Sequence, residues 1–199
     1  MTDSPLDKIL GFIGLLNQFR TIERKVLTQG CDRNENDSEH SFSLAMLAWY
    51  VNNVYELNLD TDTMLKYALV HDLVEAYAGD TFFYHPDRSF VDGKHAREEA
   101  AAQKLGTEYP EFPEIHDTIE RYEKREDRES RFIYALDKIE PVLHIYRDKG
   151  RSWRRDGVTL EMLVTMKSPK VALDKTVEGI FKELVSRVSN EQDGLFLKS

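Results

Sequence analysis

Three ionisable residues, His71, Asp72 and Glu75, lie in the middle of an apolar stretch of the chain. Gly79 and Asp80 follow them, and the spacing of the apolar residues predicts one helix that ends at Gly79. Residues three or four apart share a helix face, so Glu75 would lie one turn from both His71 and Asp72. Burying such groups is costly unless they are paired or bound to a metal. The stretch therefore indicates either metal and acid–base chemistry or a buried histidine that pairs with its neighbouring acid.

Two further residues with ligand chemistry fall on other predicted helices. His40 lies in the first turn of a helix expected from about residue 37 to 56, and it shares a stripe with Leu44. His40 should therefore face the core, although a capping role is the alternative. Asp137 is the first acid in an apolar helical run that meets Pro141 four residues later. Because proline has no N–H, we expect that helix to kink or restart, with Asp137 at the bend.

The first helix is marked by Ser4 as N-cap, Pro5 at the first helical position and Asp7 two residues later. Its apolar face is expected at Leu6, Ile9, Leu10, Ile13, Leu16 and Phe19. Arg20 and Arg24 are expected to close this helix, four residues apart and on one side. They would either complement the helix dipole or bind an anion.

The remaining elements follow from start and stop signals. Further helices are expected over residues 94–105, 114–124 and 168–188, and loops over residues 28–38 and 149–155. An aromatic run at residues 82–84 could form the floor of a binding cleft. No alternation of apolar and polar residues is long enough to predict a strand, so the sequence predicts an all-α fold.

Length and charge exclude several classes of function. The chain has 199 residues and a net charge of −9, which predicts one domain and argues against a surface that coats a nucleic acid polymer. Its single cysteine, Cys31, excludes an intrachain disulfide and suits a reducing compartment. We find no pattern typical of a signal peptide and no apolar run long enough to cross a membrane. A cytoplasmic protein without membrane contact is expected.

The candidate ligands form a coherent set when they are taken together. Two imidazoles (His40 and His71) and two carboxylates (Asp72 and Asp137) leave room for water in an octahedral shell. Open coordination positions are typical of catalytic metal sites. The order of these residues, in an all-α setting, resembles that of the HD-domain phosphohydrolase superfamily.

The resemblance extends beyond the ligands to one branch, the bacterial 5′-deoxynucleotidases and their eukaryotic relatives. It is carried by the segments at residues 37–41, 71–80 and 130–141 and by Arg24, and it spans about residues 10–147. Lys25 departs from the branch, where an aromatic residue tends to follow the arginine. The aromatic segment before Pro86 is a second departure. Both departures lie where the base and the sugar of a nucleotide would be recognised.

The resemblance implies an all-α, single-domain HD-type helical bundle over residues 1–199, with the helix at residues 168–188 packed on the core. It implies one divalent metal ion (Mn, Co, Fe, Zn or Mg) held by His40, His71, Asp72 and Asp137. It also implies a small phosphorylated substrate, a nucleotide above all, and hydrolysis of (deoxy)nucleoside 5′-monophosphates. We also expect the chain to form a homodimer.

The same resemblance suggests roles for three further residues. Glu75 would act as a general acid or base. Asp80 would take part in catalysis and hold the sugar or the leaving oxygen, and Arg24 would bind the phosphate, for which its geometry is suited.

Alternative functions remain open at this point. One is an HD-type hydrolase of another small phosphorylated metabolite. A second is a dinuclear oxygenase, whose second metal would need histidines such as His85, His95 or His116. A third is a non-catalytic HD-like binding module, which predicts loss of a ligand-type residue, and none is missing. An alarmone hydrolase would carry an acid at the position of Ala76.

Overall fold

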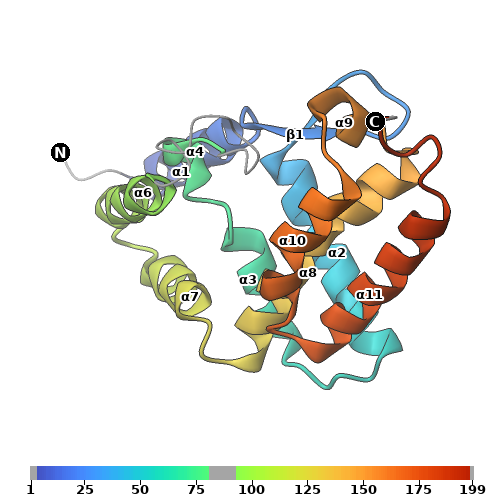
Figure 1. Ribbon diagram of the computed structural model, residues 1–199. Coiled ribbons are helices and arrows are strands. Elements are labelled where there is room, and N and C mark those ends of the chain that lie inside the picture. The colour runs from blue at the N-terminus through green and yellow to red at the C-terminus, as the bar shows by residue number, and fades with distance from the viewer. Residues whose placement is uncertain (1–3, 81–92, 198–199) are drawn as a thin grey trace.

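The structure is a computed structural model that describes residues 4–80 and 93–197. The described residues form an α-helical bundle with one small antiparallel sheet, as the sequence predicts for its main fold class (Figure 1). The elements are α1 (Pro5–Phe19), β1 (Glu23–Leu27), β2 (Asn34–Asn36), α2 (Asp37–Val54), α3 (Thr61–Val70), α4 (Glu75–Ala78), α6 (Lys94–Glu108), α7 (Pro113–Lys124), α8 (Arg128–Arg147), α9 (Arg151–Asp156), α10 (Leu160–Val171) and α11 (Lys175–Asn190).

Helix α8 is the centre of the bundle. It packs against α2, α3, α7, α10 and α11, and it buries Phe132, Leu136 and Ile139 completely. A helix that is apolar all round is a buried helix, and α8 has buried residues on several faces. A polar side chain on one of the buried faces is therefore held inside the molecule. This placement fixes Asp137 in the core, 3% exposed.

Of the kink or restart expected at Pro141, the restart is wrong. α8 runs unbroken from Arg128 to Arg147 with Pro141 inside it. Packing on all sides outweighs the one hydrogen bond that proline removes. Asp137 is directed by that packing and not by a break in the helix.

The predicted central helix is interrupted where its chemistry lies. α3 ends at Val70 with His71 as its C-cap, residues 71–74 form turns, and α4 begins at Glu75. The Glu75 N–H donates to the Asp72 carbonyl at 2.8 Å, three residues back, which is the bonding of a tighter turn. α4 ends at Ala78 with Gly79 as its C-cap at φ 74°, which confirms the predicted helix end.

The segment that joins α1 to α2 contains a hairpin that the sequence reading missed. β1 and β2 pair antiparallel, with Glu23 opposite Asn36. Arg24 therefore lies on a strand and not at the end of the first helix, which ends at Phe19. Charged residues make up most of β1, and β2 consists of Glu35 between two asparagines, so no apolar alternation marks either strand.

The start of α1 is confirmed, but its apolar face is not packed as predicted. Ser4 and Asp7 form a capping box. In contrast, Leu6, Ile9, Leu10 and Ile13 are 47–61% exposed. The apolar stripe of α1 therefore forms a surface of the described chain.

The C-terminal third also differs from the predicted boundaries. Ser168 and Pro169 lie inside α10, and the long helix begins at Lys175 because Asp174 accepts hydrogen bonds from two backbone N–H groups of its first turn. α6 continues through Gly106. The predicted basic surface turn is the short helix α9, whose Trp153 is 3% exposed. Among the described residues, no helix is both long and apolar enough to cross a membrane.

Candidate metal centre

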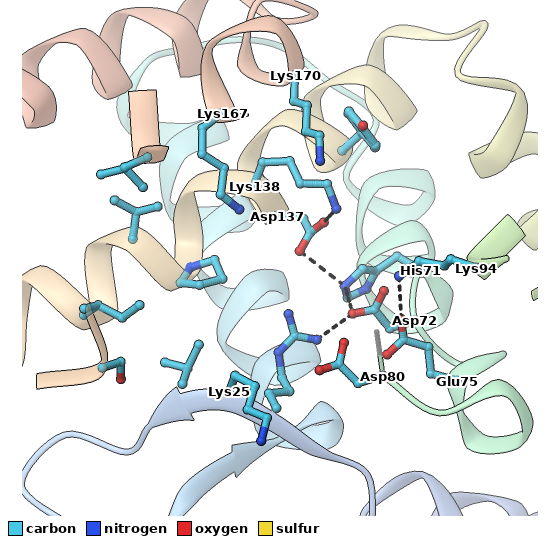
Figure 2. A pocket seen from close by; sticks show the side chains of 18 of the residues that line it. Lys25, His71, Asp72, Glu75, Asp80, Lys94, Asp137, Lys138, Lys167 and Lys170 are labelled. Carbon is cyan, nitrogen blue, oxygen red and sulfur yellow. Dashed lines mark hydrogen bonds and ion pairs between the residues drawn. The ribbon is translucent and has the colours of Figure 1, made fainter. Parts of the chain in front are cut away.

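The structure brings together the four ligand-type residues that the sequence singles out. His40 comes from α2, His71 and Asp72 from the turn after α3, and Asp137 from α8. One ligand atom from each lies within 4.8 Å of the others. His40 Nε2 is 3.0 Å from Asp137 Oδ1. His71 Nε2 is 3.0 Å from Asp72 Oδ2, and Figure 2 shows these two side chains close to Asp137. Elements distant in sequence thus converge on one point.

Both histidine rings are oriented from behind. His40 Nδ1 donates to Glu140 Oε2 at 3.0 Å, and His71 Nδ1 donates to the Ala68 carbonyl at 2.9 Å. An acceptor at Nδ1 holds the proton there and turns the Nε2 lone pair towards the cluster, as is usual for metal-binding histidines. Glu140 was missed by the sequence reading, although its position three residues after Asp137 could have indicated it.

Opposite charges hold the cluster together electrostatically. Burial works to raise the pKa of Asp72, but His71 and Arg24 hold it well below its ordinary value. Burial and Arg24 work against the charged form of His40, yet Glu140 and Asp137 raise its pKa to about 10. A bound divalent cation would take the place of that ring proton, so metal binding should release it.

The residues present fit a divalent metal. His71 Nε2 is buried without a hydrogen bond among the described residues, although a carboxylate oxygen lies beside it. An imidazole lone pair of this kind is available to a cation. Two imidazoles with two carboxylates also suit Mn, Fe, Co or Zn and leave coordination positions for water.

Arg24 reaches the cluster from β1 and is held by acids. Its Nη1 atom donates to Asp72 Oδ2 at 2.8 Å and to Asp37 Oδ1 at 3.0 Å. Burial and the charge of Asp72 raise the pKa of Asp37 to about 7. Asp37, which lies three residues before His40, is a second residue that the sequence reading did not assign a role. Arg24 therefore clamps the turn that carries Asp72 to the start of α2.

Glu75 and Asp80 lie on the other side of the cluster and line the same cavity. Glu75 is 1% exposed, and its Oε1 accepts from Lys94 Nζ of α6 at 2.9 Å. Burial and the charge of Asp72 raise the pKa of Glu75 well above its ordinary value. Burial also raises the pKa of Asp80, against the effect of Arg24. Both carboxyl groups are therefore biased towards holding a proton.

The cavity in front of the cluster has a volume of about 370 Å³. Of the residues described above, it is lined by Arg24, His71, Asp72, Glu75, Asp80, Lys94 and Asp137. An apolar surface that includes Pro141, Val142, Trp153 and Leu163 forms another part of its walls. Lysines from α8 and α10 complete the lining, and none of them was predicted. The space is of the size that binds small molecules.

The site and the fold agree with the sequence comparisons. A family model described as HD domain matches residues 16–177. The chain belongs to the HD domain family. Human 5′-deoxynucleotidase HDDC2 is 29% identical over 104 residues, which cover 52% of this chain and 48% of that protein, and the mouse protein is 28% identical over the same length. The chain thus spans about half the length of the curated relatives it matches.

Solved HD-type structures resemble the chain over most of its length. A predicted metal-dependent phosphohydrolase from Magnetospirillum magnetotacticum MS-1 is 28% identical, with a TM-score of 0.80 and 95% of each chain covered. The PH0347 protein from Pyrococcus horikoshii OT3 is 24% identical, with a TM-score of 0.65 and 91% of this chain covered. The second similarity concerns the fold alone.

The other histidines considered for a second metal do not join this HD site. His95 is exposed on α6, and His116 Nε2 lies 3.4 Å from the Tyr109 carbonyl. Neither takes part in a ligand cluster of the described residues. His85 lies outside those residues. Other acid-rich groups, such as Asp37 with Asp72 and Glu75, share members with the main cluster, so they are not separate sites.

Proposed function

We propose that this HD-domain chain is a metal-dependent phosphohydrolase that cleaves phosphate monoesters, with (deoxy)nucleoside 5′-monophosphates as its first class of substrate. The observation that supports the proposal is the convergence of His40, His71, Asp72 and Asp137 beside the buried carboxyl of Glu75. The match to proteins named 5′-deoxynucleotidase adds support for nucleotides. One divalent metal ion would be held by these four residues.

When bound, a divalent metal supplies Lewis-acid polarisation of a phosphoryl oxygen and lowers the pKa of water. Glu75 is placed to move a proton, because burial raises its pKa and favours a carboxyl that can protonate the leaving oxygen. Lys94 holds the carboxyl in position. Asp80 lines the cavity and offers an acceptor for a sugar hydroxyl.

Arg24 would contribute to phosphate binding while it orients the metal ligands. Its Nη1 atom is shared between Asp37 and Asp72, but its Nη2 atom donates no hydrogen bond to the residues that the structure describes. Because Arg24 also lines the cavity, we propose that its remaining N–H groups bind the phosphoryl oxygens, as the guanidinium geometry favours.

The test is a phosphate-release screen after EDTA treatment, with Mn²⁺, Co²⁺ and Mg²⁺ added separately. Deoxynucleoside and nucleoside 5′-monophosphates would be compared with sugar phosphates and other small phosphate esters. We expect metal-dependent release that Asp137→Ala abolishes together with metal occupancy, measured by elemental analysis. No release from any ester with any of the metals would refute the proposal, and release from sugar phosphates alone would refute the nucleotide assignment.

We also propose that two copies of the chain associate through the exposed apolar face. The face comprises ten large side chains, each 36–67% exposed: Leu6, Ile9, Leu10, Ile13 and Leu16 of α1, Phe42, Met46 and Trp49 of α2, Leu69 of α3, and Phe112. Several of them line a groove of about 610 Å³. At roughly half exposure, they present on the order of 800 Å² of apolar surface, about one partner's share of a standard interface.

A second copy is the occupant that this surface suits. In a two-fold dimer each subunit contributes the same patch, and none of the ten side chains carries a charge that would face itself. Sedimentation equilibrium should give a dimer for the wild type and a monomer for Ile9→Asp combined with Met46→Asp. Leu173→Asp, at a 43% exposed position outside the face, is the control. A monomeric wild type at micromolar concentration would refute the dimer.

We further propose a cytoplasmic setting, where the exposed Cys31 would stay reduced.

A further inference from the structure

Tyr122, in the last turn of α7, lies beside the metal-ligand cluster. The residue is 3% exposed, and it lines the cavity in front of the cluster. Its ring packs edge-on against the His71 ring, with the ring centroids 6.2 Å apart, and the Tyr67 ring centroid lies 5.9 Å from that of Tyr122. α7 therefore brings a tyrosine into contact with one of the proposed metal ligands.

The hydroxyl of Tyr122 donates no hydrogen bond to the residues that the structure describes. Tyr67 differs in this respect, because its hydroxyl donates to Asp127 Oδ2 at 2.5 Å. A buried tyrosine hydroxyl usually has a hydrogen-bond partner. A hydroxyl without one, on a residue that lines a cavity, is suited to bind a molecule in that cavity.

The charges that act on the hydroxyl indicate which part of the cavity it faces. Burial raises the pKa of Tyr122 well above its ordinary value, and the nearest acids to add to this effect are Asp137 and Asp72. Both belong to the metal-ligand cluster. A molecule bound by the hydroxyl would therefore lie at the metal end. Since a tyrosine hydroxyl carries its proton at neutral pH, it can donate to an anion there.

Two lysines on the same part of the cavity wall are paired with acids. Lys94 Nζ pairs with Glu75 and with Glu98, and Lys138 Nζ pairs with Asp137. A phosphoryl group has three non-bridging oxygens, of which the metal and Arg24 would bind two in the proposed function. The third oxygen needs a donor from another direction, and α7 supplies one.

We propose that the Tyr122 hydroxyl donates a hydrogen bond to a non-bridging oxygen of the phosphoryl group at the metal centre. The inference rests on the proposed function, because that function places a phosphoryl group there. Arg24 would hold the group from β1 and Tyr122 would hold it from α7. Two donors on separate elements restrict the orientation of the phosphoryl group more than either does alone.

Binding of inorganic phosphate tests the contact without turnover. Isothermal titration calorimetry on the Mn²⁺-loaded chain would compare the wild type with Tyr122→Phe. This variant keeps the ring that packs against His71 and removes only the hydroxyl oxygen. We expect phosphate to bind about 10- to 100-fold more weakly to the variant, as for loss of a hydrogen bond to a charged group.

The matched control is Tyr67→Phe. It removes a hydroxyl from the same group of rings, but Tyr67 does not line the cavity in front of the cluster. Tyr67→Phe should bind phosphate within about twofold of wild type, even if loss of the bond to Asp127 lowers its Tm.

Two further measurements on Tyr122→Phe separate substrate contact from a structural role. Its Mn²⁺ affinity, measured by competition with a chelator, should stay within about twofold of wild type, because the proposed ligands are unchanged. Its Tm should stay within about 2 °C, because no hydrogen bond among the described residues is lost. Its kcat/KM on the best ester should fall together with its phosphate affinity.

Three results would overturn the inference. The first is a phosphate affinity of Tyr122→Phe within twofold of wild type. The second is a parallel loss of Mn²⁺ affinity, because the hydroxyl would then act through the metal ligands. The third is an equal loss of phosphate affinity in Tyr67→Phe. Failure of the proposed function would appear differently, as absence of phosphate release from every ester, whereas phosphate binding would still report on the hydroxyl.

Discussion

Removal of Arg24 should destabilise the metal-free chain far more than removal of Arg20. Arg24 is the cation that pairs with Asp72 and with Asp37, whose side chain is fully buried. Leaving a buried charge without its partner costs about 3–5 kcal/mol, a large part of the ~5–15 kcal/mol that stabilises a typical domain. Arg20, in contrast, is an exposed C-cap residue.

The assay is thermal unfolding followed by circular dichroism on EDTA-treated protein. For a chain of this length, each kcal/mol shifts the Tm by roughly 2–4 °C, so Arg24→Ala should lower the Tm by roughly 6–20 °C. Arg20→Ala should stay within about 2 °C, since surface changes are worth about 0.5 kcal/mol or less. Saturating Mn²⁺ should reduce the difference in Tm between Arg24→Ala and wild type, because the metal compensates the charge of Asp72.

The pH dependence of this loss follows from Asp37. Its folded pKa of about 7 lies above the ordinary value, so between the two values the native state binds a proton that the unfolded state lacks. Arg24 lowers the pKa of Asp37, so the change Arg24→Ala should raise this pKa further. The destabilisation by Arg24→Ala should therefore grow as the pH rises above about 7. If the Tm of Arg24→Ala lay within 2 °C of the wild-type Tm at pH 8, the idea that Arg24 compensates buried acids would be refuted.

Three further predictions concern metal binding, catalysis and backbone geometry. His71→Ala should lose most of its bound metal after dialysis, and full occupancy by elemental analysis would remove His71 from the ligand set. Glu75→Gln should keep the metal but lose about 10²–10⁴-fold in kcat/KM on the best ester; activity within a few-fold of wild type would exclude a proton-transfer role. Gly150→Ala should cost about 2–5 kcal/mol of unfolding free energy, because φ is +72° and the new Cβ would meet the Leu195 carbonyl oxygen. Gly157→Ala, with similar φ but open space, is its control and should cost about 1–2 kcal/mol.

The sequence by itself determined the helical character of the chain and the identity of the ligand-type residues. Helix signals are local: the Ser4 cap, the Asp60 cap of α3 and the start of α2 depend on neighbours within a few residues. The choice of His40 and Asp137 rested on polar groups placed in apolar helical faces. Such placement is unfavourable without a partner, so it marks a site before the partner is known.

Tertiary structure alone decided how these residues meet and which others join them. Arg24 lies on a strand because β1 pairs with β2, a contact that charged residues on both strands conceal. The break at His71 depends on packing around the turn, not on a local helix breaker. Lys167 reaches the cavity from α10 because α10 packs against α8. Each of these features depends on a contact between segments far apart in the chain, and local propensity carries no information about such contacts.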